Sequence, residues 1–187
     1  MKHSFPVILI ASLMILGGCS PASLIDSGPD VVTYNDTIVD HLVAMDAIYE
    51  DYSTYAEETS LQYVEKIEER LEQAITAIKE RQAIMNAMGG YKGDTALIDA
   101  ANTYTVGLIA ILNDTDKDRG LVNLWKDLKA QDTPATDEQK TQAETYNANI
   151  AAQRETINKA FSEAQHAFAT KHNYTFKQTP GTGDTQK

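Results

Sequence analysis

The stretch VVTYNDTIVDHLVAMDAIYEDYSTYA, residues 31–56, decides the fold class of this protein. Its apolar residues recur at steps of three and four, a spacing that places them along one stripe of an α-helix, with acidic residues opposite. We therefore predict a helix from about Asp30 to Ala56 that buries one face against other parts of the chain. The stripe consists of Val31, Tyr34, Ile38, Leu42, Met45, Tyr49 and Tyr52.

The same helical spacing recurs in three more long segments and one short segment. None of the four long helices can bury its apolar stripe by itself. Joined by short connections, they predict an all-α fold: an antiparallel helical bundle of four long helices plus one short helix, at residues 30–174. Residues 175–187 lack periodicity, so we expect a disordered tail. The additional helices are predicted over residues 60–88, 94–112, 121–128 and 137–172.

Capping and turn residues mark most of the helix boundaries. Thr136 and Gln139 have the spacing of a capping box, as do Thr59 and Gln62, and Asp94 suits the N-cap of the third helix. Neither glycine nor proline separates the first two helices, so one bent helix is the alternative to two. The stripe of the last helix consists of Ala143, Tyr146, Ile150, Ile157, Phe161, Ala164 and Phe168.

The composition describes one acidic domain. The 187 residues include 16 Lys and Arg against 27 Asp and Glu, a formal net charge of −11. Phosphate binding draws on Lys and Arg, so such a body has no electrostatic reason to bind nucleic acid or an anionic lipid surface. Cys19 is the only cysteine, so packing must provide the stability that disulfides would otherwise supply.

Residues 1–18, MKHSFPVILIASLMILGG, have the layout of a secretory signal peptide. Lys2 gives a positive start, and an apolar run extends from Phe5 to Leu16. A run of about 12 apolar residues is too short to cross a hydrocarbon core that needs ~20. We expect this segment to be removed.

The sequence Leu16-Gly17-Gly18-Cys19 spans the end of this segment and the residue after it, and it resembles the lipobox of bacterial lipoproteins. The resemblance implies that Cys19 receives a diacylglyceryl thioether and that the chain is cut before it. Acylation of the new amino group can follow. The alternative is a free or buried cysteine after an ordinary signal peptide.

Lipidation of Cys19 would anchor the protein to the lipid bilayer of the bacterial cell envelope, with residues 19–29 as the lipidated cysteine and a flexible tether. Ser20 is not the aspartate that retains lipoproteins at the inner membrane of enteric bacteria. The resemblance therefore favours the outer membrane if the cell has two membranes, and leaves the periplasmic and surface faces open.

Two further segments lie near the two ends of the predicted bundle. They are Tyr34-Asn35-Asp36-x-Ile38-Val39 and Phe161-x-x-Ala164-Gln165-x-x-Phe168-Ala169-x-Lys171-His172-Asn173. Together they resemble uncharacterised helical surface lipoproteins of bacteria. That family has no established activity, so the resemblance implies a lipid-anchored helical domain and no catalytic residues.

The acidic turn DTDKDRG, residues 114–120, is the sharpest local motif. Alternating carboxylates can direct three oxygens at one calcium ion, as at the start of an EF-hand loop. Arg119 stands where that loop needs glycine, and Trp125 stands where it needs a bidentate glutamate. The alternative is a solvated turn whose aspartates cap helices. The candidate calcium ligands are Asp114, Asp116 and Asp118.

Histidines and tyrosines supply the other candidate site residues. Glu163 and His166 form the Glu-x-x-His half-motif of di-iron bundles, but helical geometry turns both toward water. We expect His41 at the edge of the first stripe and His172 in the fraying end of the last helix. A set of tyrosines is predicted to pack at the core with hydroxyls in water, or to form a partner surface. These are Tyr34, Tyr49, Tyr52, Tyr55 and Tyr63.

The sequence favours a non-enzymatic role. It has no G-x-S-x-G elbow, no phosphate-binding glycine loop and no H-E-x-x-H motif. The first interpretation is an envelope lipoprotein without a cofactor whose helical module binds an unknown envelope or host protein. The second is a ligand-binding or calcium-binding bundle, and the third is an envelope enzyme.

Overall fold

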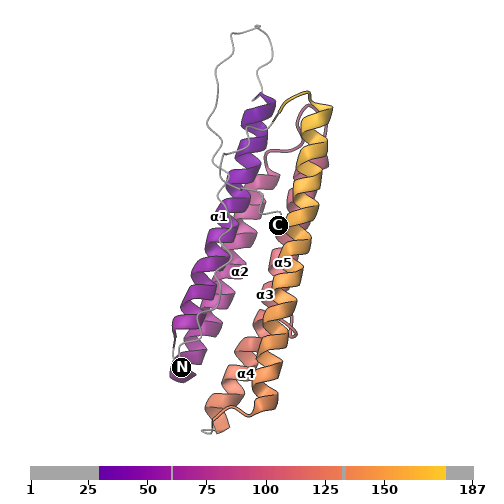
Figure 1. Ribbon diagram of the computed structural model, residues 1–187. Helices are drawn as coiled ribbons and strands as arrows, with labels where there is room; N and C mark the ends of the chain where they lie inside the picture. The colour runs from indigo at the N-terminus through magenta and orange to yellow at the C-terminus, as the bar shows by residue number, and fades with distance from the viewer. Residues whose placement is uncertain (1–29, 60, 132–133, 176–187) are drawn as a thin grey trace, which may run out of the picture.

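The computed structural model describes residues 30–59, 61–131 and 134–175, and its regular elements are helices (Figure 1). Within these ranges the one extended pairing is an isolated β-bridge between Tyr91 and Asp94. The predicted all-helical fold class is therefore confirmed for the described residues. The elements are α1 (Val31–Glu58), the 3-10 turn η1 (Leu61–Tyr63), α2 (Val64–Asn86), α3 (Ala96–Asn113), α4 (Asp118–Gln131) and α5 (Asp137–Lys171).

The first two helices are separate and lie side by side (Figure 1). The backbone becomes extended at Thr59, where ψ is 134°, directly after α1 ends. The Thr59 N–H still donates to the Tyr55 carbonyl at 3.1 Å and completes the last turn of the helix. The alternative of one bent helix is therefore wrong.

The two predicted capping boxes have different outcomes. At the start of α5, the Gln139 N–H donates to the Thr136 hydroxyl at 3.2 Å, and the Thr136 N–H donates to the Gln139 side-chain oxygen at 2.9 Å. This box is confirmed. The box of Thr59 and Gln62 is wrong, because Thr59 is the C-cap of α1 and Gln62 lies in η1. Helix α2 begins after Tyr63, which makes no side-chain cap.

The start of α3 is capped by the predicted aspartate, although the helix begins one residue later than expected. Thr95 occupies the N-cap position and its side chain makes no cap hydrogen bond. Instead, Asp94 Oδ1 accepts the Ala96 N–H at 3.1 Å. Gly89 and Gly93, with φ of 65° and 85°, turn the chain between α2 and α3.

Helices α3 and α4 follow one another along α5 (Figure 1). Together with the turn between them they span the 36 residues Ala96–Gln131, close to the 35 residues of α5. The short helix begins at Asp118, three residues before the predicted start at 121, so the end of the predicted polar turn is helical. We call residues 114–117 the α3–α4 break.

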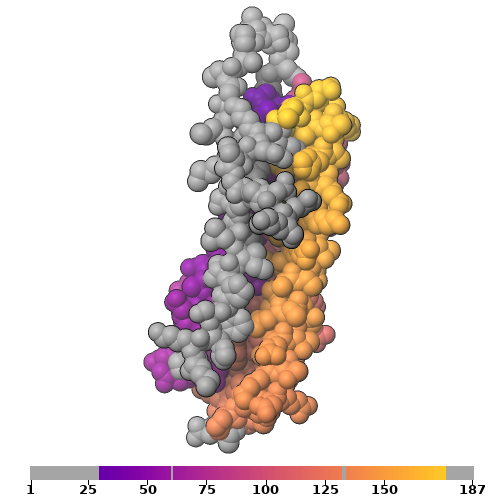
Figure 2. Space-filling model, viewed as in Figure 1, coloured from indigo at the N-terminus to yellow at the C-terminus, as the bar shows by residue number. Residues whose placement is uncertain are grey.

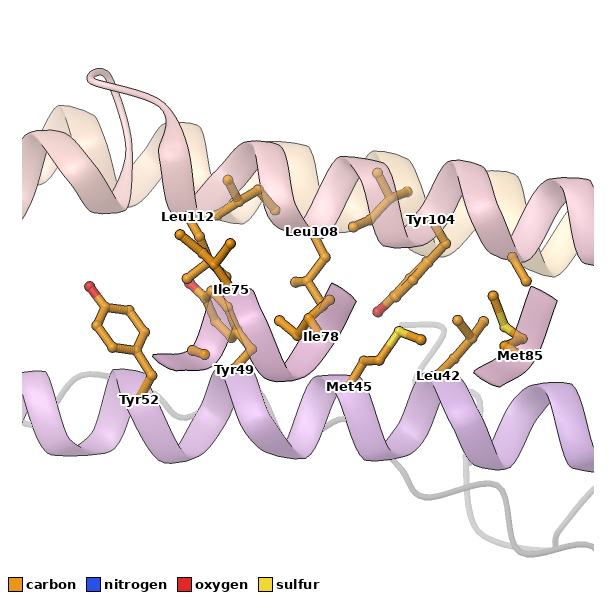
Figure 3. Close-up of a cluster of buried hydrophobic side chains, with 14 of the residues drawn as sticks. Leu42, Met45, Tyr49, Tyr52, Ile75, Ile78, Met85, Tyr104, Leu108 and Leu112 are labelled. Carbon is orange, nitrogen blue, oxygen red and sulfur yellow. The ribbon is translucent and has the colours of Figure 1, made fainter. Parts of the chain in front are cut away.

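One hydrophobic core connects the helices (Figure 3). Every member of the predicted α1 stripe is buried except Val31, which is partly buried. Burying one such apolar side chain stabilises a fold by about 1.5–3 kcal/mol. Figure 3 shows α1, α2 and α3 contributing to this core through Leu42, Met45, Tyr49, Ile75, Ile78, Tyr104, Leu108 and Leu112.

Helix α5 is buried less deeply than its stripe predicts. Of the stripe, Ile157 and Phe168 are buried, and the other residues are half-buried. The closest approach to α3 is at Gly107, where a Cβ atom would lie 2.6 Å from the Ile157 side chain. Figure 2 shows α5 along one long edge of the molecule, which accounts for its partial exposure.

The start of α1 and the end of α5 lie at the same end of the molecule (Figure 1). The rings of Tyr34 and Phe168 are 5.9 Å apart between centroids, and the Tyr34 hydroxyl donates to the Gly89 carbonyl at 2.7 Å. Tyr174, just after α5, also packs against Phe168. Apart from Thr175, the predicted disordered tail lies outside the described residues.

Candidate functional site

The predicted lipidation site lies outside the described residues. This applies to Cys19 and to the other lipobox residues Leu16, Gly17 and Gly18. The described chain begins at Asp30, whose carboxylate caps the start of α1. The signal peptide, the lipid anchor and the tether therefore stay predictions.

The structure separates the three aspartates of the predicted calcium turn. Asp114 accepts the Asp116 N–H at 2.9 Å and pairs with Lys117, and Asp116 is exposed. Asp118 is 5% exposed and bonds to α1, so the alternative of a solvated turn is wrong for this residue. Among the described residues, no group of three or more His, Cys, Asp or Glu side chains is placed to hold a metal ion.

Asp118 is a carboxylate buried in the core, at the first position of α4. The Tyr49 hydroxyl donates to its Oδ2 at 3.1 Å. Burial raises the pKa of Asp118 to about 7, although the bond from Tyr49 and the charge of Arg154 act in the opposite direction. Burial and then the charge of Asp118 raise the pKa of Tyr49, which therefore stays a neutral donor.

A second set of polar groups joins α5 to α1 and α3; we call Arg154, Asp46, Glu50, Tyr49 and Tyr104 the Arg154 cluster. The guanidinium lies 2.7 Å from Glu50 and 3.5 Å from Asp46, and 4.4 Å from the centroid of the Tyr49 ring. The Tyr104 hydroxyl lies 2.7 Å and 2.8 Å from the two Asp46 oxygens. The Arg154 side chain is 12% exposed, so these interactions are largely shielded from water.

Burial and neighbouring charges act in opposite directions on the pKa values of Asp46 and Arg154. Burial raises the pKa of Asp46, and the Tyr104 bond and the Arg154 charge oppose that rise. Burial disfavours the cationic form of Arg154, but the carboxylates of Glu50 and Asp46 outweigh it and raise the pKa of Arg154. Arg154 is therefore a fixed cation that two carboxylates share.

Our sequence analysis missed Arg154, although the sequence contains a signal for it. Arg154 lies four residues after Ile150 and three before Ile157, so it occupies the position that completes the apolar stripe of the last helix. A charge at a core position needs partners on the facing helices. Those partners are Asp46 and Glu50 on α1.

Most of the tyrosine rings pack at the core as predicted, but the environment of their hydroxyl groups differs from the prediction. Tyr34, Tyr49 and Tyr52 are buried, Tyr55 is half-buried and Tyr63 is 47% exposed. The expectation that the hydroxyls reach water is wrong for the buried three. The hydroxyls of Tyr34 and Tyr49 donate to protein oxygens, and that of Tyr52 is buried with no hydrogen-bond partner among the described residues.

The two segments that resemble helical surface lipoproteins meet in space. The Gln165 side-chain amide donates to the Asn35 oxygen at 3.0 Å, and both residues are buried. Next to this pair, Tyr34 packs against Phe168. A buried and mutually bonded polar pair fixes how two helices align, so these residues have a packing role.

A third polar site lies at the end of the molecule where α1 begins and α5 ends, and in it an aspartate contacts two basic side chains. We call Asp94, Lys171 and His172 the Asp94 cluster. Asp94 Oδ2 lies 2.8 Å from both Lys171 Nζ and His172 Nε2. The bond from Lys171, then those from His172 and a backbone N–H, lower the pKa of Asp94 to about 2. The His172 ring also packs against Tyr91 at 5.1 Å. The prediction that His172 lies in a fraying helix end is therefore wrong.

The remaining predicted candidates lie at the surface or at the core edge. Glu163 and His166 are both exposed, as their positions on the helix predict. His41 is partly buried at the edge of the α1 stripe, and its Nδ1 is buried without a hydrogen-bond partner among the described residues. Burial, followed by the charge of Arg81, lowers the pKa of His41. The Glu-x-x-His pair therefore faces away from the core.

One described stretch, Ala96–Gln131, is long enough to cross a membrane by length and composition alone, and it contains an 18-residue window with a mean hydropathy of 1.3. A helix at the centre of a hydrophobic core passes the same test. In α3, Leu108 and Ile111 are completely buried against the neighbouring helices, whereas Val106 is 60% exposed. Core packing therefore accounts for part of the apolar composition of this stretch.

Comparison with protein-family models, curated proteins and solved structures finds no match to this chain. The N-terminal sequence and the chemistry of the two polar clusters are therefore the features that bear on the function of the protein.

Proposed function

We propose that this protein is a lipid-anchored bacterial envelope lipoprotein without enzymatic activity, whose helical body serves as a partner-binding or structural module. The single observation that carries the proposal is the position of Cys19. The only cysteine of the chain follows Leu16-Gly17-Gly18 at the end of an apolar segment. Cleavage before Cys19 and acylation of its sulfur would convert a secreted domain into an anchored one.

The helical body suits an anchor of this kind. We infer that it is an antiparallel bundle of four long helices and one short helix, with Asp30 as the N-cap of α1. A flexible tether of about 10 residues between lipid and helix has a root-mean-square reach of roughly 17 Å. The end of the body that contains the start of α1 and the Asp94 cluster would then face the bilayer, and the η1 turn would point away from it.

A binding or structural role is favoured over catalysis because the buried polar groups are used within the fold. Tyr104 bonds to Asp46, Gln165 bonds to Asn35, and Arg154 is held by carboxylates. Such internal pairs stabilise helix packing and leave few groups to act on a substrate. The partner is an envelope or host protein, and the acidic charge of the chain disfavours nucleic acid.

The test is mass spectrometry of the protein isolated from bacterial membranes, together with detergent phase partitioning. The expected result is a mature chain that begins at Cys19 and carries acyl chains. Cys19→Ala should prevent processing or release the protein, whereas Ser20→Ala, which changes the next residue, should leave both unchanged. A mature chain that begins elsewhere, or that stays in the aqueous phase with a free thiol, would refute the proposal.

A further inference from the structure

The α3–α4 break brings a buried carboxylate to a point where the chain changes direction. α3 ends at Asn113, and Asp118 starts α4. Although it follows an exposed turn, Asp118 is 5% exposed and reaches α1 through the Tyr49 hydroxyl. One carboxyl group thus links the start of α4 to the middle of α1.

The cation nearest to this carboxyl on α5 is already shared by other acids. Arg154 lowers the pKa of Asp118 from a distance, but its guanidinium contacts Glu50 and Asp46. The side chains of the Arg154 cluster and Asp118 therefore comprise three carboxyl groups and one guanidinium. Glu50 is 53% exposed, but Asp46 and Asp118 are largely shielded from water, so full ionisation would leave an excess of negative charge where screening is weak.

The cations next to Asp118 in the chain are also paired elsewhere. Arg119 turns to α2, where it contacts Glu72 and lies 4.0 Å from Glu68. Lys117 pairs with Asp114, the first residue of the α3–α4 break. Neither side chain forms an ion pair with Asp118.

Two backbone donors in the first turn of α4 bond within the chain leading into it. The Leu121 N–H donates to the Lys117 carbonyl at 3.0 Å, and the Gly120 N–H donates to the Asp114 carbonyl at 3.4 Å. A Cβ atom at Gly120 would lie 2.0 Å from the Thr115 carbonyl oxygen, so the break and the first turn of α4 form one compact unit. Hydrogen bonds from these two donors to an ionised Asp118 would require this unit to move.

We propose that Asp118 is a proton-operated latch for the α3–α4 break: the protonated side chain keeps the first turn of α4 seated on α1, and loss of the proton releases that turn. A neutral carboxyl accepts the bond from Tyr49 and brings no charge into the core, whereas a carboxylate at the same place is a buried charge that needs water or a cation beside it. Burial, which raises the pKa of Asp118 to about 7, places the change near neutral pH. The latch depends on the folded body alone and is independent of lipid anchoring.

Trp125 provides the readout. It is the only tryptophan, it lies on α4 two turns after Asp118, and it is half-buried. Fluorescence of the wild-type protein, recorded from pH 5 to pH 9, should show one transition near pH 7, accompanied by a fall in the amide protection factors of residues 114–122, which are corrected for the intrinsic pH dependence of exchange. Asp118→Asn, which cannot ionise, should give a flat signal at the low-pH value and high protection factors at every pH.

Substitution of the histidines provides a separate control. His41, His166 and His172 are the three that follow Cys19. The triple substitution H41Q/H166Q/H172Q should preserve the transition. A transition that is lost in the triple variant but retained in Asp118→Asn would overturn the proposal, as would a flat signal and constant protection factors in the wild type.

Tyr49→Phe and Tyr52→Phe form a second, matched test that does not depend on the folding of Asp118→Asn. The Tyr49 hydroxyl donates to Asp118 and favours its charged form, so its removal should move the midpoint up by about one pH unit. Tyr52→Phe removes a neighbouring hydroxyl that has no hydrogen-bond partner among the described residues, and its midpoint should stay near that of the wild type. Equal midpoints for wild type and Tyr49→Phe would contradict the latch.

Discussion

Asp94 and Asp118 are two aspartates with little exposure and opposite titration. The Asp94 side chain is 10% exposed and Asp118 is 5% exposed. Asp94 contacts Lys171 and His172, and its pKa is lowered to about 2. Asp118 receives one bond from the neutral Tyr49, and burial raises its pKa to about 7. The comparison teaches that depth of burial and charged neighbours together set the pKa of a carboxylate: Asp94 is only partly buried beside two basic side chains, and Asp118 is fully buried without one.

The two aspartates should therefore affect stability in opposite directions as the pH changes. Asp94 has a folded pKa below its usual 3.8, so its contribution is present above pH 3.8 and is lost as the pH falls through 2. Asp118 has a folded pKa above 3.8, so the folded state retains a proton that the unfolded state has lost. Stability falls as the pH rises from 3.8 to 7, and the full cost is present above 7.

The largest effect is expected when the shared cation is removed. Arg154→Ala leaves Asp46 partly buried without its cation and uncovers the Tyr49 ring, so the free energy of unfolding should fall by about 3–5 kcal/mol in urea denaturation. Lys159→Ala on the same helix removes a side chain that is 76% exposed and should change stability by less than about 0.5 kcal/mol. Similar losses in the two variants would show that the Arg154 cluster has no special role.

A smaller effect, and one that depends on pH, is expected at Asp118. Three pKa units correspond to an upper limit of about 4 kcal/mol, so Asp118→Asn should be about 2–4 kcal/mol more stable than the wild type at pH 8.5. This advantage should fall to less than about half at pH 5 and disappear near pH 3.8. The measurement is urea unfolding at these pH values. A difference between the two proteins that is independent of pH would break the comparison with Asp94.

The corresponding substitution at the other cluster should have the opposite sign. Asp94→Asn removes a charge that pairs with Lys171, and Lys171 is 63% exposed, so water weakens the pair. We expect a loss of about 1 kcal/mol at pH 7 that disappears near pH 2. Thermal unfolding at the two pH values measures it, and a stabilised variant at pH 7 would contradict the assignment.

The smallest effect is expected at the unpartnered hydroxyl. Tyr52→Phe removes a buried oxygen that makes no hydrogen bond among the described residues, so stability should change by less than about 0.5 kcal/mol or rise slightly. Tyr104→Phe removes the donor to Asp46 and should cost about 1–2 kcal/mol. Chemical denaturation of the two variants shows whether hydrogen bonding by the hydroxyl group, and not ring packing alone, makes Tyr104 contribute more to stability than Tyr52.

The sequence predicts the helices well because their stripes depend on local periodicity. The α1 stripe is nearly all buried, and the capping box of Thr136 is confirmed. The η1 turn was not predicted, since no glycine or proline marks it. The chain reverses there because α1 and α2 pack against each other. The start of α2 could not be found from local signals alone.

The polar clusters were harder to predict because they depend on pairs of residues far apart in the sequence. Asp118 belongs to an acidic run that resembles a surface turn, and only the position of Tyr49 reveals that it is buried. Arg154 shows its core position by periodicity, but its partners lie more than 100 residues earlier on α1. Partner identity is a property of the tertiary fold, so single-sequence patterns do not contain it.

The shared location of the first and last helix ends has a practical consequence for experiments. The rings of Tyr34 and Phe168 are 5.9 Å apart between centroids, so a probe attached to the exposed end of α5 would lie on the same side of the body as the start of α1. On an anchored protein, an antibody or bead would have to reach that probe in the crowded layer beside the lipid headgroups. An epitope placed at η1, at the other end of α1, would project outward and suit surface-labelling and capture experiments better.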